Sequence, residues 1–235
     1  MDFFEIVKKR RSVRKFTDTN VPDEVINKSL EAALLAANSS NLQPWEFYWV
    51  KNKNKKQKLI DACFSQNAAK TAKELIVAVS RIDTWKRNKN LVIENYKKRN
   101  KLLPIVDKYY NKVIPLSYFH DSFGLSGIIK KIIFLMIDFV GLFKPIPRGP
   151  IYKSDLFEIV TKTTALACQN FMMAIVAQGY DSCPMEGFDH KRVKKILNLN
   201  NKSHVVMVIA VGKADPKGIY GERFRIDEKL VIKEI

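Results

Sequence analysis

Residues 153–178 of this 235-residue chain read KSDLFEIVTKTTALACQNFMMAIVAQ, and their apolar positions cover most of a helical circumference. A helix that is apolar on nearly every side is normally buried, so this segment is predicted to lie at the centre of the molecule. Ser154 is expected to cap its first turn, and Gly179 is expected to end it.

Three shorter segments have the composition of β-strands. They are EFYWV at 46–50, LIVAVSRI at 75–82 and HVVMVIAVG at 204–212. The second is apolar enough to be a central strand that is buried on both faces. The third, rich in valine and isoleucine, is the clearest strand of the three.

Shorter helices are predicted around these strands. One covers residues 3–10 with Asp2 as its N-cap, and another follows Pro22 with Thr19 or Asn20 as its N-cap. The other predicted helices are 55–63, 66–73 and one that begins after the N-cap Asp189.

The composition is that of a folded globular protein, because 46% of the residues are hydrophobic and 28% are charged. Cys63, Cys168 and Cys183 are odd in number and far apart, which predicts free thiols in a reducing compartment, the cytoplasm. The three histidines do not pair with the cysteines at ligand spacing, so no metal site is expected. The N-terminal residues lack the apolar core of a signal peptide.

The formal net charge of +17 is concentrated in runs of lysine and arginine. Nucleic-acid binding would need such runs on one face of the protein, preferably with aromatic side chains among them for stacking. The run at 51–58 has no aromatic residue, so a solvated surface is favoured and nucleic acid is not an expected partner. Attraction of anionic ligands or lipid head groups is the other interpretation. The runs are KNKNKKQK (51–58), WKRNKN (85–90), YKKRNK (96–101) and KRVKK (191–195).

The glycines form neither GxGxxG nor GxxxxGK[ST], so a bound phosphate would have to be held by side chains. Two arginine-rich segments could do this: RRSVR at 10–14 and RFR at 223–225. Arginines at alternate positions of an extended chain share one face and form a fork for phosphate or carboxylate. Each segment also has a plainer interpretation, as a helix C-terminus with favourable arginines or as surface charge.

The loop NSSNLQ at 38–43 has more amide and hydroxyl side chains than turn geometry requires. It is therefore expected to form hydrogen bonds with something besides itself. The segment CPMEGFD at 183–189 is either a plain loop or a tight one, in which Gly187 permits close approach to a partner.

In this order, RRSVRKF, NSSNLQPWEF, GYDSCPMEGFD, VVMVIAVG and RFR resemble the nitroreductase family of flavoproteins, over about 1–82 and 153–225. The resemblance implies one α+β domain over 1–235, with a central, mainly antiparallel sheet flanked by helices. It also implies a divergent lid or insertion at about 85–150. Such proteins are homodimers with tightly bound FMN at the interface and a C-terminal arm exchanged between subunits, for which residues 218–235 are the expected segment.

The resemblance also implies roles for individual residues. The phosphate and ribityl chain would lie against the first arginine segment and the arm, and Arg14 would approach the pyrimidine edge. Residues of the NSSNLQ loop would contact the flavin of the partner subunit. The backbone of Glu186 and Gly187 would lie near the reactive flavin nitrogen. The implied FMN-binding residues are Arg10, Arg11, Ser12, Arg14, Asn38, Ser39, Asn41, Gln43, Gln66, Pro184, Met185, Glu186, Gly187, Arg223 and Arg225.

The implied activity is hydride transfer from NADH or NADPH to FMN and then to a nitroaromatic, quinone or related small acceptor, by a ping-pong mechanism. Dehalogenation and flavin fragmentation use the same fold, so the fold alone does not select the reaction. A basic, non-enzymatic binding protein is the alternative from another class. One departure is that Ala69 occupies a position where many members have lysine, with Lys70 one step away.

The apolar stretch IIKKIIFLMIDFVGLF at 128–143 lies in the divergent middle. It is shorter than a membrane span and is interrupted by Asp138. A lid that shapes the acceptor pocket is the favoured interpretation. A membrane-surface helix with Lys130, Lys131 and Lys144 at the head groups is the second, and core packing is the third.

Overall fold

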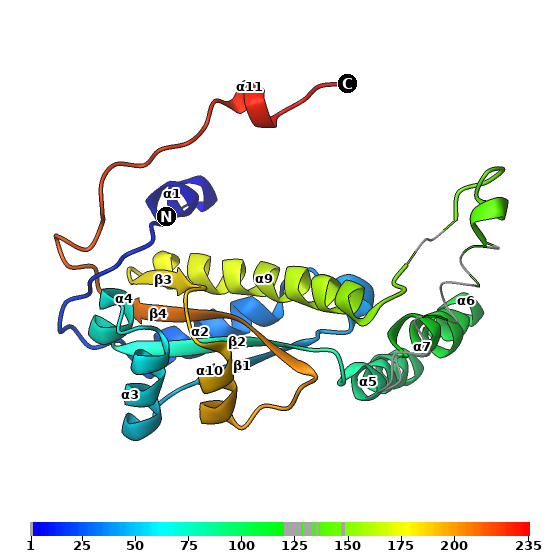
Figure 1. Ribbon diagram of the computed structural model, residues 1–235, viewed down its shortest axis with the longest axis horizontal. Coiled ribbons are helices and arrows are strands. Elements are labelled where there is room, and N and C mark those ends of the chain that lie inside the picture. Colours follow the sequence, from blue (N-terminus) through cyan, green and yellow to red (C-terminus); the bar gives the residue numbers. More distant parts are fainter. Residues whose placement is uncertain (1, 120–127, 129–132, 134, 136, 147–148) are drawn as a thin grey trace.

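The computed structural model describes residues 2–119, 128, 133, 135, 137–146 and 149–235. Within these residues a four-stranded sheet forms the middle of the molecule, with helices on both faces (Figure 1). Every neighbouring pair of strands is antiparallel, which confirms the predicted α+β architecture. The strands are β1 (Trp45–Trp49), β2 (Glu74–Arg81), β3 (Asp181–Met185) and β4 (Ser203–Gly212), in the spatial order β1-β2-β4-β3.

The central strand β2 is buried on both faces, as predicted. Its residues Leu75, Val77 and Val79 belong to one hydrophobic core. The alternate residues Ile76 and Ala78 belong to a second core on the other face. Because successive side chains point to opposite faces, burial on both sides requires apolar residues at every position. The uninterrupted apolar runs in β2 and in its neighbour β4 meet this requirement.

Helices α9 (Lys153–Ala177) and α2 (Asp23–Leu34) pack together over one face of the sheet. Phe171 and Ile175 of α9 are completely buried there, which confirms the predicted central position of this helix. Among the described helices, α9 alone is long and apolar enough to cross a membrane, and half of its apolar window is buried within the protein. Gly179, with φ of +83°, follows its end as predicted.

The predicted cap of α9 is wrong, because Ser154 does not cap the helix. The carboxylate of Asp155 instead accepts hydrogen bonds from the backbone N–H groups of Ile151 (2.8 Å) and Tyr152 (2.9 Å). A carboxylate in the first turn also interacts favourably with the positive end of the helix dipole.

The other face of the sheet is covered by α3 (Lys53–Ala62), α4 (Asn67–Thr71) and α10 (His190–Leu197). All three were predicted: the boundaries of α3 and α4 differ by two residues or fewer at each end, and α10 begins directly after Asp189, as expected. Asp189 caps α10 by accepting a hydrogen bond from the backbone N–H of Arg192 (3.1 Å), which confirms its predicted role.

Helix α1 (Phe3–Lys9) begins at its predicted N-cap. The side chain of Asp2 accepts from the backbone of Glu5 (2.9 Å), and the Glu5 carboxylate accepts from the backbone of Asp2 (3.0 Å). These reciprocal bonds form a capping box, which satisfies two backbone donors of the first turn.

Two further features differ from the prediction, and both involve proline. Strand β3 lies in a segment that was predicted to be a loop. Pro184 is tolerated there because β3 is the edge strand of the sheet, with β4 as its neighbouring strand. The N-cap of α2 is Pro22, which makes no side-chain cap, and neither Thr19 nor Asn20 has that role.

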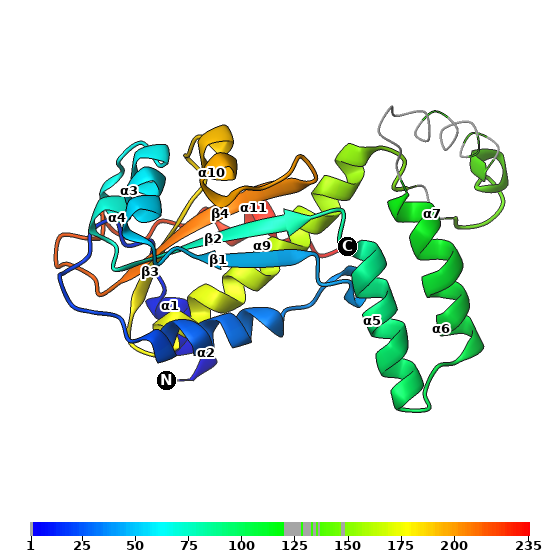
Figure 2. The ribbon, with the colours of Figure 1, turned by 90° about the horizontal axis from the view of Figure 1, so that it is seen from below.

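Residues 85–118 form a helical extension from one end of the sheet (Figure 2). Tyr110 and Ile114 pack with Leu156 and Val160 of α9 in a third hydrophobic core. The divergent middle is therefore anchored on the first half of α9. Its elements are α5 (Trp85–Lys98), α6 (Pro104–Lys108), a π-helical turn (Tyr109–Val113) and α7 (Ile114–Tyr118).

The apolar stretch 128–143 is described only in part, since Lys130 and Lys131 lie outside the described residues. Its described side chains include Ile128 (59% exposed), Phe139 (67%) and Phe143 (79%). Core packing within one chain is therefore excluded for these three. A lid or a membrane contact stays a prediction.

The arm is extended, as predicted. Every residue from Ile219 to Ile235 is exposed, and one short helix, α11 (Glu228–Val231), interrupts it. The arm passes α1 and then leaves the body of the molecule (Figure 1). Its exchange with a second subunit stays a prediction.

Candidate functional site

Residues 10–14 lie extended between the edge strand β3 and the beginning of the arm. Ser12 forms a parallel bridge with Ser182 of β3, and the N–H of Val13 donates to the Ser182 carbonyl (3.1 Å). The N–H of Arg14 donates to the Gly218 carbonyl (2.7 Å). Val13 is completely buried, so the residues before and after it are directed to the opposite side of the extended chain.

Two arginines hold the arm against the N-terminal segment. The Arg223 guanidinium donates to the carbonyls of Lys8 and Arg10 (both 2.6 Å), at the end of α1. The Arg11 guanidinium donates to the carbonyl of Gly221 (3.0 Å). Arginine does satisfy the C-terminal carbonyls of α1, but it comes from the arm and not from the RRSVR segment.

The two arginine segments surround a hollow of about 180 Å³, which Glu222 also lines. No carboxylate in the described part of the chain forms an ion pair with any arginine of this hollow. The pKa of Arg10 is lowered, mainly by burial and then by the nearby charges of Arg223, Arg225 and Arg11. Positive charge concentrated in this way favours an anionic ligand. The six predicted residues that line the hollow are Arg10, Arg11, Ser12, Arg14, Arg223 and Arg225.

A second hollow, of about 320 Å³, shares Arg14 and Tyr220 with the first. The Arg14 guanidinium lies 5.5 Å from the centre of the Tyr220 ring. At the other side, the Gln66 side chain donates to the carbonyl of Gly187 (2.6 Å). The two hollows thus form one elongated site with a cationic end and a polar end. The predicted residues that line the second hollow are Arg14, Gln66, Pro184, Met185 and Glu186.

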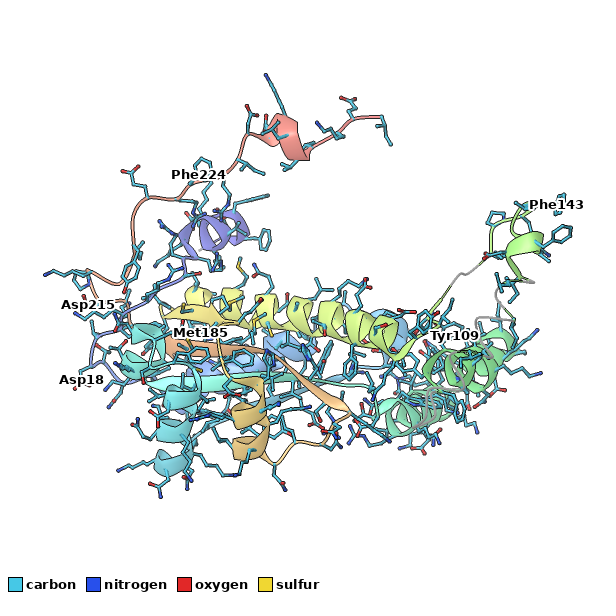
Figure 3. All side chains as sticks on the ribbon, viewed as in Figure 1. Asp18, Tyr109, Phe143, Met185, Asp215 and Phe224 are labelled. Atoms are coloured by element: carbon cyan, nitrogen blue, oxygen red, sulfur yellow. The ribbon has the colours of Figure 1, made fainter. Side chains whose placement is uncertain are left out.

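The NSSNLQ loop lies far from these hollows. It leads into Trp45, which pairs with Ser80 at one end of β2, whereas Ser182 lies near Glu74 at the other end. At ~3.3 Å per residue, the two ends of β2 are about 20 Å apart. In Figure 3, Met185 and Tyr109, a neighbour of the loop, lie well apart along the long axis of the molecule. One chain does not bring Asn38, Ser39, Asn41 and Gln43 to the arginines.

The amide side chains of the loop partly bind one another. The side-chain Oδ1 of Asn38 accepts from the backbone N–H of Gln43 (2.9 Å), and the side-chain Nε2 of Gln43 donates to Oδ1 of Asn41 (3.1 Å). Ser40, Asn41 and Gln43 all have positive φ, between 46° and 56°. Three non-glycine residues with positive φ in one short loop store backbone strain, which persists only where the surroundings enforce it.

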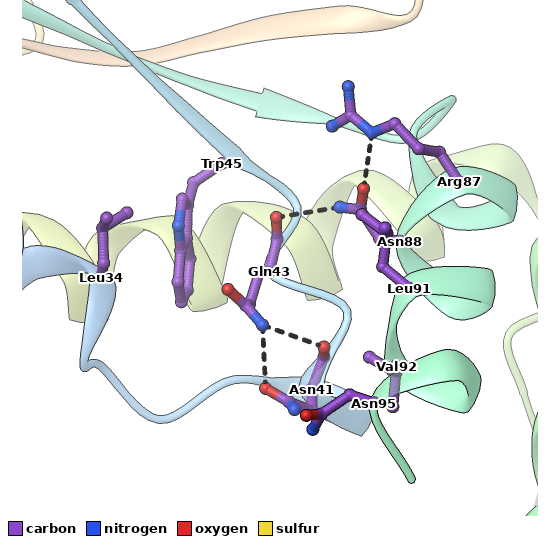
Figure 4. Close-up of a pocket in the computed structure, with 9 residues that line it drawn as sticks. All are labelled: Leu34, Asn41, Gln43, Trp45, Arg87, Asn88, Leu91, Val92 and Asn95. Atoms are coloured by element: carbon purple, nitrogen blue, oxygen red, sulfur yellow. Dashed lines mark hydrogen bonds between the residues drawn. The ribbon is translucent and has the colours of Figure 1, made fainter. Parts of the chain in front are cut away.

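The helical extension supplies that enforcement. The Asn88 side chain donates to the carbonyl of Leu42 (2.7 Å), and the Tyr110 hydroxyl donates to the carbonyl of Ser40 (2.9 Å). The loop therefore forms hydrogen bonds outside itself, as expected, and those bonds include the ones from Asn88 and Tyr110 of the helical extension. Figure 4 shows Asn41 and Gln43 beside α5 at a pocket of about 390 Å³, which Leu34 and Trp45 also line.

Sequence reasoning missed several residues of these sites. Tyr220 and Asn67 line the second hollow, where the Asn67 amide donates to the Tyr220 hydroxyl (3.3 Å). Nothing in the local sequence marks Tyr220, whereas Asn67 is next to the predicted Gln66. Asn88 and Tyr110 lie in the divergent middle, and only their contacts with the loop reveal their role.

Solved structures define the class of protein to which this fold belongs. The structure described as "putative nitroreductase ydfN" from Bacillus subtilis has a TM-score of 0.76 at 22% identity, covering 99% of this chain and 98% of its own. The structure described as "a putative nitroreductase in complex with FMN" from Exiguobacterium sibiricum has a TM-score of 0.72 at 22% identity, covering 100% and 98%. The fold is that of the nitroreductase-type oxidoreductases.

The sequence comparisons give the family itself. The pattern of the nitroreductase family matches residues 7–107 and 140–213, which is most of the chain. The Bacillus subtilis protein named "Putative NAD(P)H nitroreductase YdgI" is 25% identical over 96% of this chain and 95% of its own length. The chain belongs to the nitroreductase family and is an oxidoreductase. The arm, with Arg223 and Arg225, lies outside the matched residues.

We expect removal of the Tyr110 hydroxyl to loosen the strained loop without unfolding the protein. Tyr110→Phe deletes one hydrogen bond to the Ser40 carbonyl, so the free energy of unfolding should fall by only about 1 kcal/mol. Amide hydrogen exchange of residues 40–43 should become much faster. Tyr96→Phe, against the same hydrophobic core, is the control, because the Tyr96 hydroxyl forms no hydrogen bond with the loop among the described residues. Unchanged exchange in Tyr110→Phe would show that the tyrosine does not hold the loop.

Proposed function

We propose that this protein is an FMN-dependent oxidoreductase that takes hydride from NADH or NADPH and reduces a nitroaromatic, a quinone or a related small acceptor. The elongated pair of hollows that share Arg14 and Tyr220 is the observation that carries the proposal. FMN in the related Exiguobacterium structure and the NAD(P)H nitroreductase name of the Bacillus relative support it.

The residues present fit FMN. The phosphate suits the first hollow, where the arginines lack carboxylate partners and the pKa of Arg10 is lowered by burial and by neighbouring positive charge. A phosphate dianion would offset that charge with short, charge-assisted hydrogen bonds. The polar edge of the ring suits the second hollow, with Gln66 at its rim. The N–H of Gly187 is bound by no acceptor among the described residues and remains available to a ligand.

The bound cofactor would supply hydride acceptance and donation, and the protein would hold and orient it. Donor and acceptor would use the same space in turn, which gives ping-pong kinetics. Ala69 is completely buried, and the exposed Lys70 does not line the second hollow. Positive charge beside the ring would therefore come from Arg14.

A homodimer would complete this site. The amide-rich loop lies about 20 Å from the arginines of its own chain, so it would serve the cofactor of a second copy. The exposed side chains of Phe3 (65%) and Phe4 (72%) on α1, Leu166 (52%) on α9 and Phe224 (77%) on the arm support an interface on this side. Apolar surface of this extent is typical of contacts between subunits.

The test of the function is spectroscopic. The purified protein should be yellow, with flavin absorbance that bleaches anaerobically on addition of NADH or NADPH and returns with an added quinone. Protein that remains colourless and releases no FMN after reconstitution would refute the proposal.

Loss of one arm arginine should weaken FMN binding. Among the described residues, the guanidinium of Arg225 bonds only the carbonyl of its neighbour Phe224, so its removal should not disturb the fold. Charge-assisted hydrogen bonds contribute roughly 1.5–3 kcal/mol, so the Kd of FMN should rise about tenfold or more in Arg225→Ala. Lys229→Ala, on the same arm, is the matched control. An unchanged Kd measured by flavin fluorescence would contradict the phosphate site.

The shared site predicts complementation between two defective chains. Asn41→Leu should lower flavin occupancy because it alters the loop that serves the partner, while Arg225→Ala alters the other half. A mixed dimer of the two variants has one intact site and one doubly altered site. After differently tagged chains are mixed and refolded, the mixed dimer isolated through both tags should therefore hold about half of the wild-type flavin content. Full FMN binding by a monomer in sedimentation would contradict the shared site.

A further inference from the structure

Helices α3 and α10 lie side by side on the face of the sheet opposite α9 (Figure 1). The backbone N–H of Asp189, just before α10, donates to the carbonyl of Ala62 at the end of α3 (2.8 Å). Leu59 and Val193 bury the inner sides of the two helices in the same core. The outer sides are left to solvent.

These outer sides are strongly cationic. The two helices together have eight lysines and arginines and one acidic residue, Asp61. In the sequence these basic residues belong to two runs, 51–58 and 191–195, which are about 130 positions apart. Folding brings the two runs onto one face, which was the condition that the sequence left open for nucleic-acid binding.

The two helices border a groove of about 590 Å³. Lys55 and Lys58 stand one turn apart on one side, and Arg192 and Lys195 stand one turn apart on the other, while Asp61 and Ile196 complete the lining. Residues three apart on a helix are separated by ~4.5 Å along the axis, so each side presents a short row of cations. Within the described residues, Lys55, Lys58 and Lys195 form no ion pair, whereas Arg192 pairs with Asp189 (3.3 Å).

The cations in the first turns of both helices work against helix stability, whereas Lys194 and Lys195 in the last turn of α10 interact favourably with the helix dipole. The first turn of α3 contains Lys53 and Lys55, and that of α10 contains Lys191 and Arg192, with no acidic residue in either first turn. Positive charge at a helix N-terminus is repelled by the helix dipole, and like charges one turn apart repel each other. Local choices that oppose stability are most readily explained by a function of the surface they form.

We propose that the α3–α10 groove binds the phosphodiester backbone of double-stranded nucleic acid, without regard to sequence. Two rows of cations that flank a groove match a strand of phosphates lying between them. Neither helix has a phenylalanine, tyrosine or tryptophan, and the one imidazole, His190, already packs against the rings of Phe188 and His204, which argues for backbone contact alone. A flat lipid surface would not enter the groove.

Duplex binding measured by fluorescence anisotropy tests this directly. The probe is a labelled 20-base-pair DNA of mixed sequence, titrated with the full chain at 50 to 200 mM NaCl. We expect a Kd of about 1–10 µM near ~100 mM salt, which is in the range of non-specific binding. Absence of binding at 50 mM NaCl would overturn the proposal.

Two triple variants of equal net charge distinguish DNA binding in the groove from a general effect of the protein's positive charge. Lys55→Glu, Lys58→Glu and Lys195→Glu together lower the net charge by the same amount as Lys97→Glu, Lys98→Glu and Lys101→Glu, at exposed positions of α5 and just after it. The groove variant should lose at least about 30-fold in affinity, and its salt slope should fall by about three. The control should lose less than about threefold. Equal losses would show that only net charge matters and would overturn the proposal.

The groove variant should remain folded. Lys55 is the third residue after the N-cap Asn52, which accepts from its backbone N–H (3.0 Å), so Lys55→Glu could form a capping box. Its melting temperature should therefore stay the same or rise. If the triple charge reversal lowers it, the Lys→Gln triple at the same positions repeats the comparison.

The last measurement uses anionic vesicles in which phosphatidylserine makes up about a third of the lipid. Vesicle binding lost in the groove variant while DNA binding persists would overturn the proposal in favour of a lipid surface. DNA binding lost in that variant without a matching loss of vesicle binding would support it.

Discussion

Burial of both faces of β2 and β4 is the constraint on which the rest of this structure depends. Leu75, Val77 and Val79 need a cover on one side, and Ile76 and Ala78 need one on the other. Helices α2 and α9 provide one layer, and α3, α4 and α10 provide the other. Since no functional polar group fits between these layers, the binding residues lie at the edges and ends of the sheet.

That arrangement divides the candidate cofactor site. The arginines meet where the N-terminal segment, β3 and the arm run side by side, and the amide-rich loop is at the far end of β1. The loop is fixed there by Asn88 and Tyr110 from the divergent middle. The helical extension at 85–118, which the family pattern matches up to residue 107, therefore holds the conformation of a loop that the family resemblance assigns to the cofactor.

Much of the fold was predictable because hydrophobic periodicity is a local property. The central helix, three strands and the capping roles of Asp2 and Asp189 were all predicted correctly. Strand β3 was missed because Pro184 normally argues against a strand, and only its edge position removes the objection. Ser154 was a reasonable cap, but the carboxylate of Asp155 reaches the free backbone donors.

The sequence by itself determined which residue types were available: arginines for an anion, amides and hydroxyls for a polar edge, and lysine runs for a basic surface. Only the tertiary structure decided which of them became neighbours. It joined residues 10–14 to Arg223 and Arg225, united two distant lysine runs in one groove, and kept Asn41 away from the arginines. The physical reason is that side-chain chemistry is set residue by residue, whereas proximity depends on how elements far apart in the chain pack around a sheet buried on both sides.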